Sequence, residues 1–184
     1  MQRTLVVLHV VLASFYLPMG VMYAITGGLY GLGIKGGYET VETSVATDAP
    51  VAKELSQLVA IAEEALRDRG LADPTGSAGI KSSGTSFHLE WTGTERDVEV
   101  HPTEDPMVAK VRIKDTSAYR RLVQLHKAKG GELFKWFAAT WMTGLVALFV
   151  TGGLMAYARK PFRRLALVAS LLGVAAFLVL ASAS

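Results

Sequence analysis

Three long runs of apolar residues flank a more polar middle segment of the chain. The first run, from Thr4 to Leu32, contains no Asp, Glu, Lys or Arg and one histidine, His9, and two further runs occupy 136–158 and 165–183. About 20 apolar residues are enough to cross the ~30 Å hydrocarbon core of a bilayer. The first run is also longer than the roughly 7–15 apolar residues of a secretory signal, so we expect it to remain as an anchor. The pattern predicts three membrane-spanning helices, at 4–34, 133–158 and 165–183.

The basic residues predict how these helices are oriented. Four of the six residues in 159–164 are Lys or Arg, and short loops rich in Lys and Arg stay on the cytoplasmic side of a membrane. We therefore expect 159–164 to be a cytoplasmic basic loop. Three spans then place the N-terminus with Arg3 in the cytoplasm, and the middle segment 35–130 and the C-terminus outside it.

The charge distribution excludes one class of function. The 184 residues carry 19 Lys and Arg against 16 Asp and Glu, a net charge of +3, and a basic balance can indicate a nucleic-acid binder. All acidic residues lie between Glu39 and Glu132, and the stretch 35–132 has 13 basic against 16 acidic residues, a net of −3. The excess positive charge thus belongs to the membrane-flanking ends, and we expect no nucleic-acid partner. The absence of cysteine excludes disulfides and thiolate chemistry.

The middle segment combines helical and alternating patterns. Apolar residues recur at helical spacing after Asp48, a candidate N-cap, and continue until Gly70. Strict alternation then predicts strands, with a turn at 92–94 between the first two. Residues 35–48 are a linker or an edge strand. We expect an α+β domain with one apolar and one polar sheet face, formed by a helix, three or four antiparallel strands (78–82, 86–91, 97–101 and 107–114) and a final helix at 116–129.

The polar face of the central hairpin contains candidate metal ligands. His88 and His101 lie there with nearby Glu residues, and two imidazoles with carboxylates can bind a transition metal. Lys and Arg at 110, 112 and 114 give an alternative, because cross-strand ion pairs explain the carboxylates without a metal. No Ser-His-Asp arrangement, phosphate-binding Gly loop or paired buried carboxylate is recognisable, so no catalytic residue is predicted and an enzymatic activity is left open.

Two short motifs each occur twice in or near the first two spans. Leu-His occurs at 8–9 and 125–126, and Thr-Gly-Gly-Leu at 26–29 and 151–154. Ionisable residues within a membrane indicate function, which makes His9 and His126 candidate ligands. Glycines allow helices to approach closely, and we expect this role for four of them: Gly27, Gly28, Gly152 and Gly153.

These motifs, with the basic 159–160 ending, resemble the PepSY-associated transmembrane family over about residues 1–160. The resemblance implies a PepSY-like extracytoplasmic domain, a bacterial inner membrane, and a link to iron or siderophore uptake. Larger members resemble ferric reductases that hold b-type haem between membrane histidines, so the resemblance makes haem possible without requiring it. This chain differs from them in having only three predicted spans.

The predicted topology separates the two membrane histidines. His9 lies near the cytoplasmic side and His126 at or beyond the external side, roughly 30 Å apart along the membrane normal. They cannot both ligate one haem. Haem binding would therefore need a symmetric dimer, a partner subunit or another ligand. Three hypotheses remain: an accessory subunit that binds a membrane-protein partner or a second copy, a haem protein of electron transfer, and a regulator of an extracytoplasmic protease.

Overall fold

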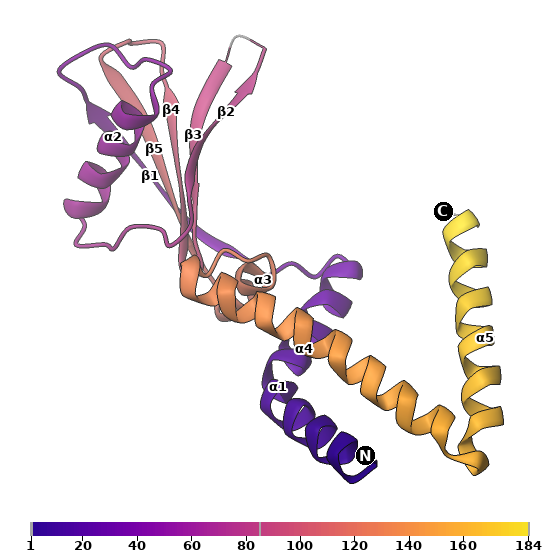
Figure 1. The fold of residues 1–184 in the computed structure, drawn as a ribbon. Helices are drawn as coiled ribbons and strands as arrows, with labels where there is room; N and C mark the ends of the chain where they lie inside the picture. Colours follow the sequence, from indigo (N-terminus) through magenta and orange to yellow (C-terminus); the bar gives the residue numbers. More distant parts are fainter. Residues whose placement is uncertain (1, 85, 184) are drawn as a thin grey trace. The chain divides into compact units, whose positions relative to one another are not determined.

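The computed structural model describes residues 2–84 and 86–183 (Figure 1). The chain forms two compact units. One contains the residues up to Gly20 and those from Ala139 onward, and the other contains Val21–Ala138. Three helices are long and apolar enough to span a membrane, which confirms the predicted number. They are α1 (Gln2–Gly31), α4 (Gly131–Ala158) and α5 (Lys160–Ala183).

The second unit contains an antiparallel sheet in the order β1-β5-β4-β3-β2. Three or four strands were expected, and residues 2–84 and 86–183 form five. The additional strand is the polar segment after the first span, which pairs along its whole length with β5, so the edge-strand alternative for 35–48 is correct. The strands are β1 (Tyr38–Ala46), β2 (Ala78–Ser83), β3 (Ser86–Thr92), β4 (Arg96–Pro102) and β5 (Val108–Thr116).

Helix α2 (Leu55–Arg67) covers the apolar face of this sheet, as the alternation predicts (Figure 1). The register aligns apolar residues of β3, β4 and β5 in cross-strand rows, one of which joins Leu89, Val100 and Val111. All three are fully buried, and Leu58 and Leu66 of α2 are buried against the same core. Each such side chain contributes about 1.5–3 kcal/mol on burial, so these contacts stabilise the unit.

Helix α2 starts later than its sequence indicates. The Asp48-Ala-Pro50 pattern predicts an N-terminus at 48, but the helix begins at Leu55. The backbone N–H groups of Thr47 and Val51 donate instead to the carbonyls of Met107 and Pro106, at 2.9 and 2.8 Å. These tertiary hydrogen bonds hold the segment extended.

Helix α3 (Ala118–His126) follows β5 and is shorter than the expected 116–129. The Ser117 hydroxyl caps its first turn by accepting from the Arg120 N–H at 3.3 Å. Ala128 adopts a left-handed φ of 57°, and the Lys129 N–H returns to the Gln124 carbonyl at 3.0 Å. This arrangement ends the helix as C-terminal capping motifs do.

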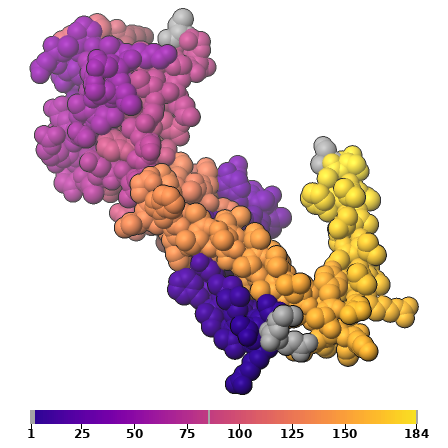
Figure 2. Space-filling view, in the orientation of Figure 1, coloured from indigo at the N-terminus to yellow at the C-terminus, as the bar shows by residue number. Residues whose placement is uncertain are grey.

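Helices α4 and α5 are almost continuous in sequence. Residues 160–164, expected to belong to a basic loop, form the first turns of α5, and only Arg159 separates the helices. The Arg163 guanidinium donates to the Tyr157 carbonyl at 2.9 Å across the bend. Helix α5 contains no buried residue, and its visible face is uncovered (Figure 2).

Candidate functional site

The first membrane histidine, His9, is hydrogen-bonded to a threonine of α4 in the same unit. His9 Nδ1 of α1 lies 2.9 Å from Thr151 Oγ1 of α4. Thr151 is buried, and its hydroxyl donates to the Ala147 carbonyl one turn earlier, at 2.7 Å. A hydroxyl has a single proton, so the His9 Nδ1–H is the donor to Thr151. In the neutral ring the lone pair is then on Nε2.

The second histidine has the same arrangement within the other unit. His126 Nδ1 lies 2.7 Å from Thr26 Oγ1. Thr26 is 1% exposed, and its hydroxyl donates to the Met22 carbonyl at 2.6 Å. The His126 Nδ1–H is therefore the donor here too. The Tyr23 ring lies against the imidazole, with the two ring centroids 4.4 Å apart.

The glycine after each threonine gives the histidine ring its space. A Cβ on Gly27 would lie 3.2 Å from His126 Cε1, and a Cβ on Gly152 would lie 3.4 Å from His9 Cε1. The second glycines differ, because nothing lies within 4 Å of a Cβ on Gly28 and only Tyr157 is near one on Gly153, at 3.8 Å. Each Thr-Gly pair therefore contacts one histidine ring. The sequence showed the Leu-His and Thr-Gly-Gly-Leu motifs as separate repeats and did not indicate which of them meet.

The two membrane histidines lie in different units of the structure. His9 belongs to the first unit and His126 to the second. A mainly apolar pocket of about 330 Å³ lies beside His126. Its lining residues are Thr26, Gly27, Tyr30, Gly31, Val123, His126 and Lys127.

The donor set fits one axial position of a haem at each histidine. The Thr contact fixes Nδ1 and leaves Nε2 as the ligating atom, as is usual for metal-bound histidines with a hydrogen-bonded second nitrogen. Haem iron between two histidines needs a second imidazole, and in the part of the chain that the structure describes each membrane histidine is paired with a threonine instead. The second ligand would come from a symmetric dimer, a partner subunit or another type of ligand, as expected from the sequence.

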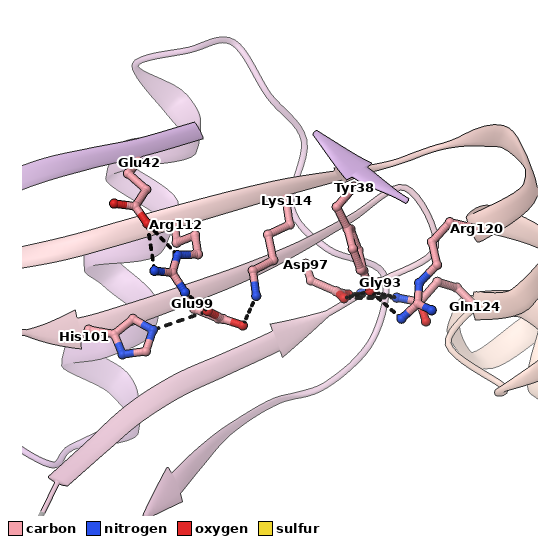
Figure 3. Close-up of polar contacts among 10 residues, drawn as sticks. All are labelled: Tyr38, Glu42, Gly93, Asp97, Glu99, His101, Arg112, Lys114, Arg120 and Gln124. Carbon is pink, nitrogen blue, oxygen red and sulfur yellow. Dashed lines mark hydrogen bonds and ion pairs between the residues drawn. The ribbon is translucent and has the colours of Figure 1, made fainter. Parts of the chain in front are cut away.

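The predicted metal ligands of the sheet lie directly opposite each other. The register Leu89↔Val100 places His88 across from His101, and their rings stack with centroids 4.8 Å apart. His101 Nε2 lies 3.3 Å from Glu99 Oε2, and Glu99 also pairs with Lys114 (Figure 3). No group of three or more His, Asp or Glu is arranged for a metal within residues 2–84 and 86–183.

Ion pairs account for most of the carboxylates on this face. Arg112 bridges Glu42 and Glu99, at 2.7 and 3.4 Å (Figure 3). Burial alone would raise the pKa of Glu99, but the hydrogen bonds from Lys114 and His101 outweigh it and lower that pKa. The hydrogen bonds from Lys110 and Arg112 lower the pKa of Glu42. The ion-pair alternative is therefore present on this face, and metal binding by the two histidines stays a prediction.

Sequence reasoning missed a buried polar network at one end of the sheet. Asp97 is 7% exposed and accepts hydrogen bonds from Tyr38 Oη at 2.7 Å, Gly93 N at 3.0 Å and Gln124 Nε2 at 3.0 Å (Figure 3). Arg120 donates to the same Tyr38 hydroxyl at 2.7 Å. Burial and the hydrogen bond to Asp97 raise the pKa of Tyr38 to about 12. Nothing in the sequence linked Tyr38, the first residue of β1, to Asp97.

Comparison with protein-family models, with curated proteins and with solved structures gave no match for this chain. The resemblance to the PepSY-associated transmembrane family therefore stays a prediction from short motifs.

Proposed function

We propose that this chain is an accessory subunit of a membrane complex, in which α5 binds either a membrane-protein partner or a second copy of the chain. The observation that carries the proposal is the exposure of α5, which has no buried residue over its 24 residues. Helices α1 and α4, by contrast, contain buried residues, including Met19 and Trp141. Helix α5 contacts α4 through the hydrogen bonds of Arg163 and Ser170 with Tyr157, and most of its surface remains available to pack against another helix.

The two sides of α5 differ in a way that favours a protein contact on one of them. At 100° per residue, Ala169, Gly173 and Ala176 share one face, and Leu171 and Leu178 lie on the opposite face. Small residues let helix backbones approach, whereas bulky apolar side chains suit lipid. We therefore place the partner at the small-residue face. The family resemblance supports a bacterial inner membrane, with the sheet outside and a link to iron or siderophore uptake.

The chain has no cysteine, so single-cysteine variants give a clean test. Gly173→Cys tests the small-residue face and Leu171→Cys is the matched control, both in native membranes. Oxidation should give a disulfide-linked homodimer of Gly173→Cys if the partner is a second copy. A maleimide photocross-linker should give one defined adduct if the partner is a different protein. The proposal is wrong if neither variant forms a dimer or an adduct, or if both variants cross-link equally.

A second function has specific support, namely a b-type haem shared between subunits. The support is the Nδ1-to-threonine bond of His9 and of His126, which orients each Nε2 for coordination. A haem bound there would supply one-electron redox chemistry. In this chain Thr26 and Thr151 would hold the rings, and Gly27 and Gly152 would make room for them.

The visible spectrum of the complex, purified from native membranes in mild detergent, tests this second function. A haem-bound complex should show a Soret band when oxidised and an α-band after dithionite reduction. His9→Ala or His126→Ala should remove the bands, and Thr26→Val or Thr151→Val should shift them. A colourless complex would rule out this function and leave the accessory role intact.

A further inference from the structure

The chain has four histidines, and two of them form a cross-strand pair outside the membrane helices. His88 of β3 and His101 of β4 are directly opposite in the register. Side chains of such pairs start from Cβ atoms about 4.5–5.5 Å apart, and here the ring planes are inclined by only 18°. The two rings therefore lie close enough to share one ion once the His88 ring turns about its χ2, with His101 left in place.

Glu99 prepares His101 for metal binding. The Nε2–H of His101 donates to Glu99 Oε2 at 3.3 Å, which leaves the lone pair on Nδ1. A histidine that donates its second N–H to a carboxylate is the usual arrangement around protein-bound metals, because the carboxylate fixes the tautomer and raises the basicity of the ligand.

The surroundings leave the pair accessible and partly shielded from like charge. Helix α2 packs on the opposite, apolar face of the sheet, and the His101 side chain is 32% exposed. The neighbouring ammonium groups are paired, because Lys81 lies 3.8 Å from Glu90 and Lys110 lies 2.5 Å from Glu42. Imidazole ligands suit Cu²⁺, Ni²⁺ and Zn²⁺, and Cu²⁺ is the strongest in the Irving–Williams order.

We propose that His88 and His101 form a two-histidine site for a divalent transition metal, with Cu²⁺ bound most tightly and water completing the coordination. Glu99 acts as a positioning residue that orients His101. The site lies on the sheet and is independent of the proposed partner contact of α5 and of the membrane histidines.

The test uses the full-length protein in detergent, purified with a histidine-free tag and titrated with Cu²⁺ alone. Calorimetry should give one tight site per chain, and electron paramagnetic resonance should show coupling to nitrogen. Loss of a metal ligand, in His88→Ala or His101→Ala, should weaken binding by more than about tenfold, and Glu99→Gln by about 10–100-fold. Ni²⁺ and Zn²⁺ should bind in the same place more weakly.

Matched controls separate this site from other binding. The double variant with His9→Ala and His126→Ala keeps only the sheet pair and should bind Cu²⁺ as the wild type does. Glu64→Gln removes an exposed carboxylate of α2, on the opposite face of the sheet, and should also leave the affinity unchanged. Unchanged affinity in His88→Ala and His101→Ala would overturn the proposal, as would a wild-type signal without nitrogen coupling.

A measurement on the wild type alone does not depend on the folding of any variant. Diethylpyrocarbonate modifies accessible imidazoles, and the modified residues are located by mass spectrometry. Bound Cu²⁺ should protect His88 and His101 together. Failure of Cu²⁺ to protect them would also refute the site.

Discussion

Replacement of Asp97 by alanine tests whether the buried network holds helix α3 to the sheet. The carboxylate, 7% exposed, accepts from the Tyr38 hydroxyl, the Gly93 N–H and the Gln124 amide at 2.7 to 3.1 Å. Asp97→Ala removes all of these acceptors at once. The Gly93 N–H and the Gln124 amide then remain in an environment that water reaches poorly.

The expected cost follows from these contacts. A hydrogen bond to a charged group is worth about 1.5–3 kcal/mol net, and the bonds to one carboxylate are not additive. A buried donor left without its acceptor costs about 1–3 kcal/mol, so the two left on Gly93 and Gln124 would together cost about 2–6 kcal/mol. We expect Asp97→Ala to fall in this range because burial leaves little solvent to compensate. Asp97→Asn retains the shape and one acceptor oxygen, so its cost should be about half.

Hydrogen exchange measured by mass spectrometry reports this cost in the intact membrane protein. A loss of about 3 kcal/mol corresponds to a fall in protection of roughly a hundredfold, and it should appear in the peptides of β4, β5 and α3. Asp73→Ala, in an exposed loop, is the matched control and should change protection little. Unaltered exchange in β4 and α3 of Asp97→Ala would contradict the structural argument.

Three further predictions concern the same unit and the helix pair. Burial and the hydrogen bond to Asp97 raise the Tyr38 pKa from 10.0 to about 12. The stability that the protonated Tyr38 contributes is therefore complete below pH 10 and is lost as the pH rises from 10 to about 12. Near-UV circular dichroism should show unfolding in this alkaline range, and the effect should be weaker in Tyr38→Phe. Burial opposes the shift, but Lys114 and His101 lower the pKa of Glu99 from 4.5. The stability that ionised Glu99 contributes is therefore present above pH 4.5 and is lost as the pH falls through the lowered pKa. In far-UV circular dichroism, Lys114→Met should diminish this loss of stability at acid pH. A Cβ on Gly144 would overlap the Tyr16 ring, whereas one on Gly20 would meet nothing within 4 Å, so Gly144→Ala should destabilise the protein by about 1–3 kcal/mol in detergent-denaturant titrations and Gly20→Ala should not.

The sheet was largely predictable because a sheet with one buried face needs apolar and polar residues to alternate along each strand. The pattern of Phe87, Leu89 and Trp91 against polar neighbours defined β3 to within one residue. Strand β1 was ambiguous because it is an edge strand: its burial pattern has no fully buried position, so no apolar alternation selects it. The start of α2 was wrong because Asp48 and Pro50 gave a local capping signal that the hydrogen bonds to Pro106 and Met107 override.

The candidate sites were predictable as residue types but not as pairs. His9, His126 and the two Thr-Gly-Gly-Leu motifs stood out because polar groups in an apolar run are conspicuous. Which threonine meets which histidine depends on the way α1 packs against its neighbours, and local sequence does not contain that information. The Asp97 network was missed for the same reason, since its members Tyr38, Gly93 and Gln124 are far apart in the chain.

Helix α3 contacts both the Asp97 network of the sheet and the Thr26 hydroxyl of α1. Gln124 and His126 are two residues apart, about 200° around the helix axis, so they point to opposite sides of α3. Gln124 donates to Asp97 in the sheet, and His126 donates to Thr26 in α1. A helix of only nine residues held from both sides should transmit a displacement from one contact to the other.

Nuclear magnetic resonance of ¹⁵N-histidine-labelled protein can measure this transmission, because the chain gives only four histidine spin systems. Asp97→Ala should weaken the Nδ1–H donation of His126 to Thr26 and shift the ring nitrogens of His126. The ring nitrogens of His9, which is bonded to Thr151 in the other unit, should not move. Thr26→Val should abolish the His126 response, because it removes the acceptor. Equal shifts of His9 and His126 in Asp97→Ala would instead indicate a global disturbance, and an unchanged His126 would show that α3 holds its two contacts independently.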